Sequence, residues 1–529
     1  MITLTIDGIE VKVAEGTNLI EAASAVGIEI PTYCYHPGLT VVGQCRICFV
    51  EVEGMPRLVT ACSTPVQDDM VVLTASDRVR EARAAVMEFL LENHPLDCPV
   101  CDQAGECGLQ DYSVEHGLDT THMVDERRTF PGFERRRIGP NVVQNQNRCI
   151  HCTRCIRFTR EISETADLTM KSRGNHSYID TFDGEPLDNP WSACVADVCP
   201  VGALTVEEFR FRARVWHLEE VPTICPGCSI GCNVLLGHLD GVVHRFIPRH
   251  NPEINGWWMC DYGRFLAEGF NQRDIDQPLL REGSREKTVS WAQAIERLAE
   301  LVQGNSGTRV VASANLSNEA LFSVRRNLVE KAGLEVVVPV DVGDERSIKN
   351  AHGEWIRSRD AHPNAAGARL IGLKLVDAAE LESFVREGEK PLIVLDADAH
   401  PWLRSEAVTA AVGDREVAVL ARTATVLTGA ATILLPLASW SEAEGTFTSS
   451  TGRVQLARQA LPPKGQARAA WEVVHRLAHQ LGHEAEGDAS PRTLFAAMAA
   501  EIQAFAGMTY GRLQSEPGMP IHGEVSRVG

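Results

Sequence analysis

Alternating apolar and polar residues open the chain. In MITLTIDGIEVKV the apolar positions recur every second residue on both sides of the turn-forming pair Asp7–Gly8, which predicts a β-hairpin. The next segment, TNLIEAASAVG, changes to a helical period and predicts a short amphipathic helix that Thr17 caps and Gly27 ends. Two strand-like segments follow, RICFVEVEG and MPRLVTACSTPV.

A longer helical pattern follows in SDRVREARAAVMEFLLEN. Its apolar residues are predicted to form one stripe: Val79, Ala82, Val86, Phe89 and Leu90. Pro95 cannot continue a helix, so this helix is predicted to end just after His94.

The pattern changes at about residue 274. Apolar runs such as RVVASANLS, LEVVVPV, PLIVLDADA and ATILLPLAS alternate with helix-like segments such as SWAQAIERLAELVQ, which predicts α/β layers with parallel sheets. The longest uncharged run, TATVLTGAATILLPLASWS, contains Thr, Gly and Pro, so it is predicted to be a buried strand with its loops and not a membrane span.

Length and charge narrow the classes of protein. At 529 residues the chain is expected to form roughly three or four domains. A net charge of -20 argues against nucleic acid or an anionic membrane surface as a direct partner. Because a hairpin pattern opens the chain, no secretory signal is expected there.

The cysteines are the strongest chemical signal. All 16 lie between Cys34 and Cys260, and C-x2-C pairs recur among them. Disulfide scaffolds are typically small and secreted, so clustered C-x2-C pairs in this large chain point to metal binding.

The first group is Cys34, Cys45, Cys48 and Cys62. A strand pair, a helix and then a loop with three thiols is the layout of a β-grasp ferredoxin, in which one loop wraps the cluster and a distant cysteine closes it. This group is predicted to bind a [2Fe–2S] cluster, with a structural zinc as the alternative.

The second group has only three cysteines, and they have the spacing C-x2-C-x5-C: Cys98, Cys101 and Cys107. His94, four residues before the first of them, is predicted to be the fourth ligand of an iron–sulfur site with one His and three Cys. Replacing a thiolate by a neutral imidazole should raise the reduction potential, as in Rieske centres. The competing donors are Asp97, Asp102 and His116.

The third group combines a C-x2-C-x2-C run with a distant Cys-Pro: Cys149, Cys152, Cys155 and Cys199. This is the spacing of bacterial ferredoxins, and it predicts one [4Fe–4S] cluster. A second cluster would need another complete run near Cys199, where only Cys194 is present; Cys194 is therefore predicted to be a buried spectator.

The fourth group has the pattern C-x2-C-x3-C-x27-C: Cys225, Cys228, Cys232 and Cys260. Spacing alone would also suit zinc, but three iron–sulfur groups upstream favour a third [4Fe–4S] cluster. Fifteen cysteines and His94 then supply sixteen ligands for four clusters.

Four segments together resemble one family, the large iron–sulfur subunit of bacterial respiratory complex I, which is the G subunit of NADH-quinone oxidoreductase. They are PTYCYHPGLTVVGQCRICFVEVEG, ENHPLDCPVCDQAGECGLQD, NRCIHCTRCIRFTRE and DVCPVGALT. The resemblance is dense over residues 1 to about 270 and looser beyond. It implies that His94 is a cluster ligand and, from the fourth cysteine group, that the protein is bacterial.

The resemblance also implies a function. Such a subunit passes single electrons from a flavin- and NADH-binding partner towards quinone-reducing iron–sulfur partners. It works as part of a respiratory-chain translocase on the cytoplasmic face of the inner membrane, peripherally and without a membrane span of its own. The first three clusters would lie on the electron path, and the cluster at Cys225 to Cys260 beside it, in a structural role. The chain lacks a G-x-G-x-x-G fingerprint, so no NADH, flavin or substrate site of its own is expected.

The expected fold class is α+β iron–sulfur domains followed by an α/β domain that resembles molybdopterin oxidoreductases. Five domains are predicted. Residues 1–78 form a β-grasp [2Fe–2S] domain, residues 79–140 a [4Fe–4S] domain with one His and three Cys ligands, and residues 141–217 a ferredoxin-like [4Fe–4S] domain. Residues 218–273 form a [4Fe–4S] domain with four Cys ligands, and residues 274–529 form the truncated α/β domain.

No molybdenum cofactor is expected in the last of these domains. No cysteine follows Cys260, and in CDYGR Tyr262 occupies the place where active relatives have a lysine. The domain is interpreted as a scaffold that docks partners and shields clusters.

Two alternatives remain open. One is an electron-transfer subunit of an NAD-linked formate dehydrogenase or hydrogenase, and the other is a zinc-stabilised binding protein without a redox role. A further hypothesis concerns three arginines that adjoin thiolates and would stabilise reduced clusters: Arg46, Arg154 and Arg157.

Overall fold

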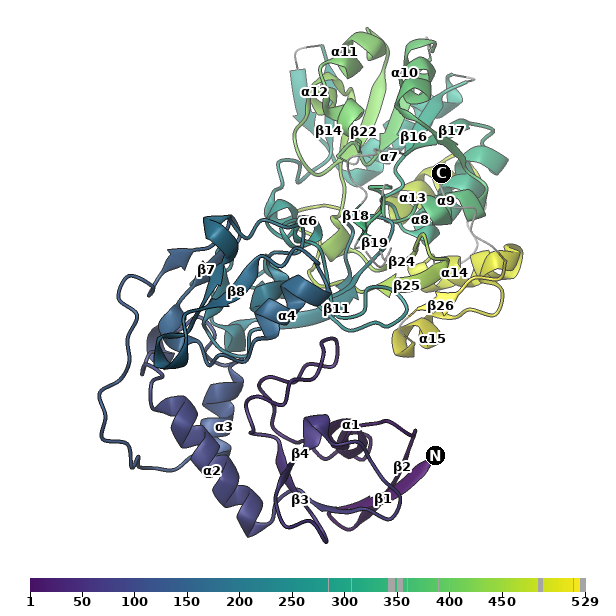
Figure 1. Ribbon diagram of the computed structural model, residues 1–529. Coiled ribbons are helices and arrows are strands. Elements are labelled where there is room, and N and C mark those ends of the chain that lie inside the picture. The colour runs from purple at the N-terminus through teal and green to yellow at the C-terminus, as the bar shows by residue number, and fades with distance from the viewer. Residues whose placement is uncertain are drawn as a thin grey trace. The chain divides into compact units, whose positions relative to one another are not determined.

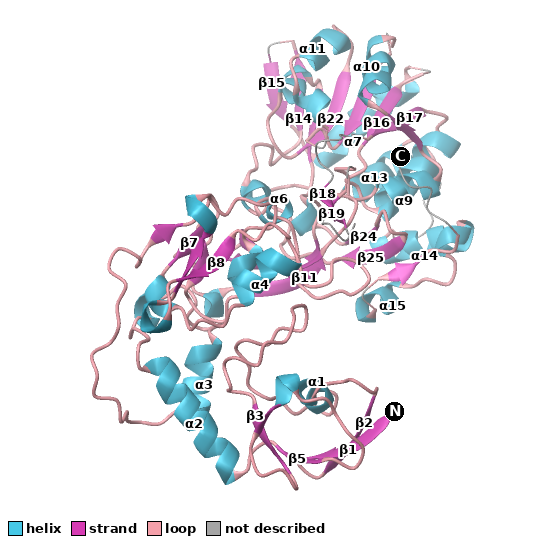
Figure 2. Cartoon of the chain, in the orientation of Figure 1, coloured by secondary structure: helices cyan, strands magenta, loops and turns pink. Residues whose placement is uncertain are grey.

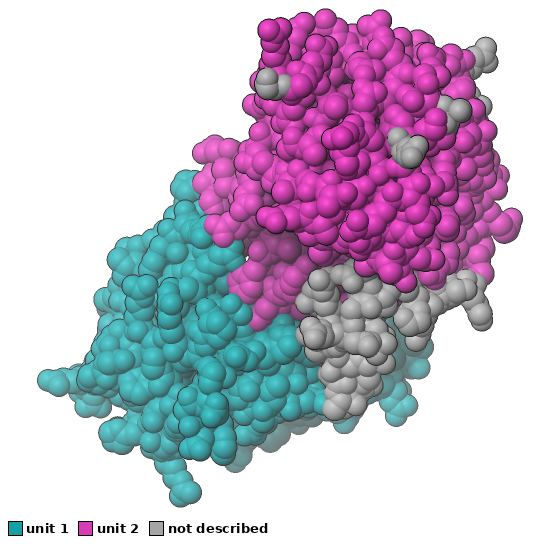
Figure 3. Space-filling model, turned by 90° about the horizontal axis from the view of Figure 1, so that it is seen from above, with its two compact units in different colours: residues 1–218 teal, residues 219–529 magenta. Residues whose placement is uncertain are grey.

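The chain divides between Leu218 and Glu219 into two units, which Figure 3 distinguishes by colour. The structure is a computed structural model, and it describes residues 1–283, 285–305, 307–340, 348–349, 355–358, 360–388, 390–398, 400–483, 489–516 and 518–523. Each unit is described by itself.

The first unit begins with a five-stranded sheet in the order β2-β1-β5-β3-β4, with helix α1 beside it (Figures 1 and 2). Its elements are β1 Ile2–Ile6, β2 Ile9–Val13, α1 Leu19–Ser24, β3 Phe49–Val52, β4 Val59–Thr60 and β5 Val71–Leu73. The hairpin β1–β2 is confirmed, and Asp7 and Gly8 form its turn with φ of 46° and 84°. The predicted cap was wrong by one residue, because the Asn18 side chain, not that of Thr17, accepts the Glu21 N–H at 3.0 Å.

Helix α2, Asp77–Leu91, is capped by Ser76 and packs against α3, Gly108–His116. It ends three residues before His94, earlier than predicted. The predicted stripe was also wrong at Phe89, whose side chain is 65% exposed, whereas Met87 is fully buried. The helix is thus rotated so that Val79 and Met87 face the interior. The Tyr33 hydroxyl contacts both helices, at Met87 Sδ and at the Gly108 carbonyl, each at 3.3 Å.

Two small sheets and two short helices complete the first unit. The sheets have the orders β10-β7-β6 and β8-β9. Their bounds are β6 Arg136–Arg137, β7 Val142–Gln144, β8 Leu168–Lys171, β9 Tyr178–Thr181 and β10 Leu204–Val206, and the helices are α4 Arg154–Glu161 and α5 Cys194–Asp197. These elements are short, so loops make up much of this unit.

The second unit begins with an antiparallel sheet of three strands, followed by one turn of helix. Its elements are β11 Glu219–Ile224, β12 Asn233–Leu239, β13 Val242–Pro248 and α6 Asp261–Arg264.

The main sheet of the second unit has eight strands in the order β15-β14-β23-β22-β21-β16-β17-β20. Their bounds are β14 Leu279–Glu282, β15 Arg285–Thr288, β16 Arg309–Ala312, β17 Glu335–Pro339, β20 Lys374–Val376, β21 Leu392–Leu395, β22 Val417–Ala421 and β23 Ile433–Pro436. Six neighbouring strands of this sheet run parallel to one another, in the order β23, β22, β21, β16, β17 and β20. The predicted α/β layers with parallel sheets are therefore confirmed.

Helices cover both faces of this sheet, and a separate apolar core lies on each face (Figure 1). One face packs against α7 Trp291–Gln303, α8 Asn318–Ser323, α9 Ala365–Ile371 and α13 Ala470–Gln480, and the other against α10 Ala378–Arg386, α11 Ala407–Val412 and α12 Val426–Ala430. A π-helical segment, Val324–Lys331, continues α8. In the long uncharged run the strand β23 is buried as predicted, but a Thr425–Thr428 capping box turns the residues before it into α12.

The remaining elements are β18 Ile348–Lys349, β19 Trp355–Arg357, β24 Gly445–Thr448, β25 Arg453–Ala457, β26 Met519–Pro520, α14 Pro491–Glu501 and α15 Tyr510–Ser515. Among the described residues, no helix has both the length and the apolar character that crossing a bilayer requires.

Candidate metal centres

The first cysteine group forms two contacting pairs. The Cys34 and Cys45 backbone N–H groups each donate to the other residue's sulfur, at 3.4 Å. The Cys48 and Cys62 thiols also hydrogen-bond to each other, and this bond lowers the pKa of Cys62. The loop between Cys45 and Cys48 turns at Arg46, whose φ of 67° is left-handed, an unusual conformation that clusters at functional sites.

In the Cys34–Cys45 pair, the hydrogen bond from Cys45 lowers the pKa of Cys34 to about 5. A thiolate is the form that ligates metal, so one member of the pair is poised for it.

The second group lies between α2 and α3. Cys98 begins a short 3₁₀ turn and is exposed, whereas Cys101 and Cys107 are each 8% exposed, and Cys107 directly precedes α3. Gly202 approaches from the loop after Cys199, where a Cβ atom would lie 2.2 Å from Cys101 Sγ. Only glycine allows this approach, so the second and third cysteine groups are packed against each other.

His94, the predicted fourth ligand, lies two residues beyond the C-cap of α2. Burial, followed by the Arg148 charge, lowers the pKa of His94 to about 4 and keeps the imidazole neutral, the form that binds metal.

The competing donors all have other partners. Asp102 accepts the Phe211 N–H at 2.8 Å, and Asp97 accepts from Arg148 at 2.8 Å. The His116 ring is tilted against the Tyr112 ring, with the two centroids 5.9 Å apart.

The third group lines one small, apolar cavity. Its four cysteines share the lining with Ile150, Ile179, Val201, Ala203 and other residues: Cys149, Cys152, Cys155 and Cys199. His151 and Thr153, which alternate with these cysteines, have φ of 54° and 61°, so the loop coils tightly around the cavity. Burial raises the pKa of Cys149 and of Cys199 to about 12. Cys194 lies on helix α5 and is fully buried.

Arg157 connects the first and third groups. This side chain is 6% exposed, and its Nη2 donates both to the Cys34 carbonyl at 2.5 Å and to the Cys152 carbonyl at 3.3 Å. Its Nη1 donates to the Thr40 carbonyl at 2.5 Å. One guanidinium therefore holds a ligand loop of each group at a fixed separation.

A second arginine connects the second and third groups. Arg148 Nε and Nη2 donate to Asp97 Oδ2 at 3.0 and 2.8 Å, and Arg148 is 5% exposed. Asp97 directly precedes Cys98, and Arg148 directly precedes Cys149. The sequence analysis considered Asp97 only as a competing ligand and missed its ion pair with Arg148. The one feature of the sequence that could have indicated this ion pair is that each of the two residues directly precedes a cysteine.

The fourth group lies in the second unit, at the β11–β12 connection and at the start of α6. Its members are all 5–6% exposed: Cys225, Cys228, Cys232 and Cys260. The Cys225 N–H donates to the Cys232 carbonyl at 2.7 Å, which closes the loop. A Cβ atom on Gly263 would lie 2.7 Å from Cys225 Sγ and 3.8 Å from Cys260 Sγ, so these two thiols share one space.

The donor chemistry of all four groups fits iron–sulfur clusters, which are held by thiolates and occasionally by imidazole. Among the described residues, no three His, Cys, Asp or Glu side chains are arranged to hold a single metal ion. Ligands on the corners of a cluster lie further apart than those of one ion.

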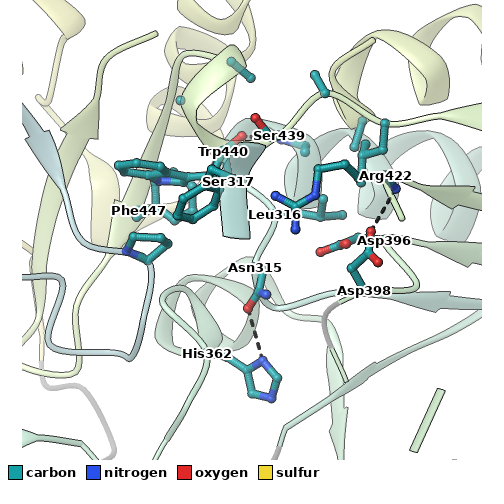
Figure 4. A pocket seen from close by; sticks show the side chains of 18 of the residues that line it. Asn315, Leu316, Ser317, His362, Asp396, Asp398, Arg422, Ser439, Trp440 and Phe447 are labelled. Atoms are coloured by element: carbon teal, nitrogen blue, oxygen red, sulfur yellow. Dashed lines mark hydrogen bonds between the residues drawn. The ribbon is translucent and has the colours of Figure 1, made fainter. Parts of the chain in front are cut away.

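The residues of the second unit do not fit a molybdenum cofactor. A cavity near the fourth group (Figure 4) is lined by Gly227 and Tyr262, and its described lining includes no thiol. Tyr262, which is 43% exposed, contributes an uncharged phenol to this lining.

Comparison with known families covers most of the first half of the chain. Residues 1–77 match a 2Fe-2S iron-sulfur cluster binding domain, and residues 83–122 match the NADH-ubiquinone oxidoreductase-G iron-sulfur binding region. Residues 139–205 match the ferredoxin-like domain of NADH-quinone oxidoreductase subunit 3. Residues 218–272 and 414–480 match the molybdopterin oxidoreductase Fe4S4 domain and molybdopterin oxidoreductase. The predicted fold class is confirmed.

Curated relatives agree with these matches. The 78 kDa mitochondrial subunit of NADH-ubiquinone oxidoreductase from Candida albicans is 37% identical over 78% of this chain and 56% of its own length. The 75 kDa subunit from Reclinomonas americana and the G subunit of NADH-quinone oxidoreductase from Rickettsia bellii are each 38% identical over 63% of this chain and 48% and 49% of their own lengths. The chain spans about half the length of these relatives.

A solved structure of an NAD+-reducing [NiFe]-hydrogenase chain is 30% identical and covers 40% of this chain and 91% of its own. Its TM-score of 0.37 is too low to support an inference.

Proposed function

We propose that the chain belongs to the same family as the G subunit of NADH-quinone oxidoreductase and the 75 and 78 kDa subunits of NADH-ubiquinone oxidoreductase, and that it is the electron-transferring iron–sulfur subunit of such a complex. The proposal assigns it no substrate site of its own.

Four clusters are proposed, with one domain for each and a fifth, cluster-free domain with the boundaries given above. The proposed ligands of the [2Fe–2S] cluster are Cys34, Cys45, Cys48 and Cys62. Those of the three [4Fe–4S] clusters are His94, Cys98, Cys101 and Cys107; Cys149, Cys152, Cys155 and Cys199; and Cys225, Cys228, Cys232 and Cys260.

When bound, such clusters take up and release single electrons. The chain's own contribution is to fix the spacing between them, to exclude water and to supply compensating charge. Arg157 performs all three tasks for the first and third groups, because it is buried and donates to a carbonyl of each. Arg148 and Asp97 fix the spacing between the third and second groups in the same way.

The proposed partners are other subunits of the complex. Electrons would arrive from a flavin- and NADH-binding subunit and leave towards quinone-side iron–sulfur subunits. The proposed location is peripheral, at the cytoplasmic face of the inner membrane. The fourth group lies in the other unit of the chain, and we assign it a structural role.

The observation that carries the proposal is the linkage of three ligand groups within the first unit by buried hydrogen bonds and a close glycine contact. A zinc-stabilised scaffold would not need ligand loops held to one another through their backbone carbonyls.

The test is analysis of the full chain, purified under strictly anaerobic conditions. We expect brown protein that contains iron and acid-labile sulfide, with paramagnetic signals of both cluster types on reduction and no reaction with NADH alone. NADH should reduce the clusters only after a flavin-containing partner subunit is added. Zinc in place of iron and sulfide would refute the proposal.

A further inference from the structure

The contacts described above join the first cysteine group to the third and the second group to the third. They do not join the first group to the second. Tyr33 lies between these two groups: it directly precedes Cys34, and its side chain is fully buried. It is therefore placed to form the third link.

The Tyr33 hydroxyl reaches the second group through the backbone. It lies 3.3 Å from the Gly108 carbonyl and 3.3 Å from Met87 Sδ, and its single O–H donates between these two acceptors. Gly108 directly follows Cys107. A residue beside one proposed ligand thus holds the backbone beside another, although the two are 75 positions apart in the chain.

The Tyr33 ring is packed as closely as its hydroxyl is bonded. It meets the Tyr112 ring of α3 edge-on, with the two centroids 5.4 Å apart. A Cβ atom on Gly108 would lie 3.7 Å from the Tyr33 ring and 3.8 Å from the Tyr112 ring, so the two rings close around the start of α3. A movement of Tyr33 would therefore shift the residue that follows Cys107.

The space between the two groups is apolar. One cluster of buried residues fills it, and Cys45 of the first group packs against this cluster, which includes Tyr33, Ile47, Met87 and Cys107. Charges interact more strongly across such a core than across water, because the local dielectric constant is low. A change of charge at one group is therefore felt at the other, to a degree that depends on how firmly the two are held together.

We propose that Tyr33 is a positioning residue, which holds the Cys107 side of the second site directly against the first site, so that the two interact without the third as an intermediary. This inference rests on the proposed cluster ligands and deepens that function. The Tyr33 hydroxyl itself takes up no electron and gives up no proton in this role.

The test is Tyr33→Phe in the full, cluster-containing chain under anaerobic conditions, because this change removes the hydroxyl and keeps the ring. When the [2Fe–2S] site and the His94–Cys107 site are both reduced, each speeds the spin relaxation of the other, and this effect falls steeply with separation. We expect the variant to keep its iron and sulfide and to lose much of this mutual effect in electron paramagnetic resonance. The effect between the [2Fe–2S] site and the Cys149–Cys199 site should stay as it is, because Arg157 still holds that pair.

The midpoint potential of the His94–Cys107 site should also fall in Tyr33→Phe. The Gly108 carbonyl beside Cys107 loses a donor, so an added negative charge is less stabilised there. We expect the one-electron equilibrium to change about threefold, which is ~28 mV at ~59 mV per tenfold change.

Tyr35→Phe is the matched control. Tyr35 lies on the other side of Cys34 and is also buried, but its hydroxyl donates to Glu21 on α1, at 2.9 Å, within the first domain. This variant should keep both the relaxation effect and the potential of the His94–Cys107 site.

Three results would overturn the inference and leave the proposed function intact. They are no mutual relaxation effect between the first and second sites of the unaltered chain, no change in Tyr33→Phe with its iron retained, or the same changes in Tyr35→Phe. The first of these uses the unaltered chain, so it does not depend on a variant folding. Absence of iron from the unaltered chain would refute the proposed function itself, and this inference with it.

Discussion

The two units of this chain bury their interiors in different ways. In the first, cysteine side chains form part of the core itself: one cluster of buried residues combines Tyr33, Ile47 and Met87 with Cys107, and cysteines from two other groups pack against it. In the second, two large apolar cores lie on the faces of a regular sheet, and three of the four cysteines, Cys225, Cys228 and Cys232, lie in a separate and smaller apolar cluster. The comparison suggests that bound clusters complete the fold of the first unit, whereas apolar packing is sufficient for the sheet of the second.

A physical reason supports this division. Thiolates that carry no metal repel one another, and burying an unpaired charge is costly. Where ligands lie in the core, the free energy of metal binding becomes free energy of folding. The strands of the main sheet in the second unit are instead apolar along their whole length, as in LIVL of β21 and ILLP of β23.

The largest effect is expected from Cys152→Ser. It removes one proposed ligand from the cavity of the third group, so we expect the loss of about four irons per chain, because the cysteine thiolates hold the cluster in place. The first unit should then become protease-sensitive while the main sheet of the second stays resistant. Iron analysis and limited proteolysis measure the two outcomes.

Cys194→Ser is the matched control, because Cys194 is equally buried but lies on α5, away from the lining of the cavity. It should keep its iron. Equal iron loss in both variants, or equal protease sensitivity in both units, would contradict the comparison.

The next effect concerns Asp396 in the second unit. Burial raises the pKa of its carboxyl from 3.8 to about 7, so its contribution to stability is full below about pH 3.8 and is lost as the pH rises through 7. An asparagine at this position would be neutral at every pH and would also tolerate the left-handed φ of 71° that Asp396 has. At pH 8 we therefore expect Asp396→Asn to stabilise the sheet by up to about 4 kcal/mol, at about 1.4 kcal/mol per unit of pKa.

Urea-dependent pulse proteolysis at pH 5 and pH 8 measures this difference, which should shrink at the lower pH. Asp414→Asn, at an exposed position after α11, should change neither value. A stabilisation of equal size at both pH values would mean that the Asp396 carboxyl ionises normally.

The sequence predicted more of the second unit's sheet than of the first unit's packing. Runs such as LEVVVPV and PLIVLDADA are periodic over a whole element, so β17 and β21 were found. The exposure of Phe89 was missed, because the burial of α2 depends on Tyr33 and α3, which approach it from distant parts of the chain. The cysteine groups were visible as spacings, but the hydrogen bonds from Arg157 to the Cys34 and Thr40 carbonyls join residues more than a hundred positions apart and leave no local pattern. The contact of Tyr33 with the Gly108 carbonyl spans 75 positions and leaves none either.

A smaller effect is expected from Arg157→Gln. Removing a buried positive charge beside two ligand loops should make both the [2Fe–2S] cluster and the Cys149–Cys199 cluster harder to reduce. We expect both midpoint potentials to fall by about 60 mV, a tenfold change in the one-electron equilibrium. Redox titration followed by electron paramagnetic resonance measures both in one sample.

Arg160→Gln is the control on the same helix, because Arg160 is exposed and its loss should leave both potentials unchanged. If the midpoint potential of only one of the two clusters changes, the Arg157 charge acts on one ligand loop and does not link the two groups.

The smallest effect tests whether every part of the first unit depends on iron. Asp180 on β9 accepts from Arg136 and, at 2.9 Å, from Lys171. Although burial opposes it, these bonds lower the pKa of Asp180, so its contribution to stability is present above about pH 3.8 and is lost as the pH falls through the lower folded-state value. Asp180→Asn should therefore destabilise the β8–β9 hairpin by about 1 kcal/mol at pH 7, with a smaller loss in acid, measured by hydrogen exchange. Asp183→Asn, exposed on the same segment, should have no effect. Neither β8 nor β9 contains a cysteine. If Asp180→Asn lowers the stability of the hairpin equally with and without iron, the hairpin is stabilised locally. If it lowers the stability only when iron is bound, the dependence on clusters extends to the whole unit.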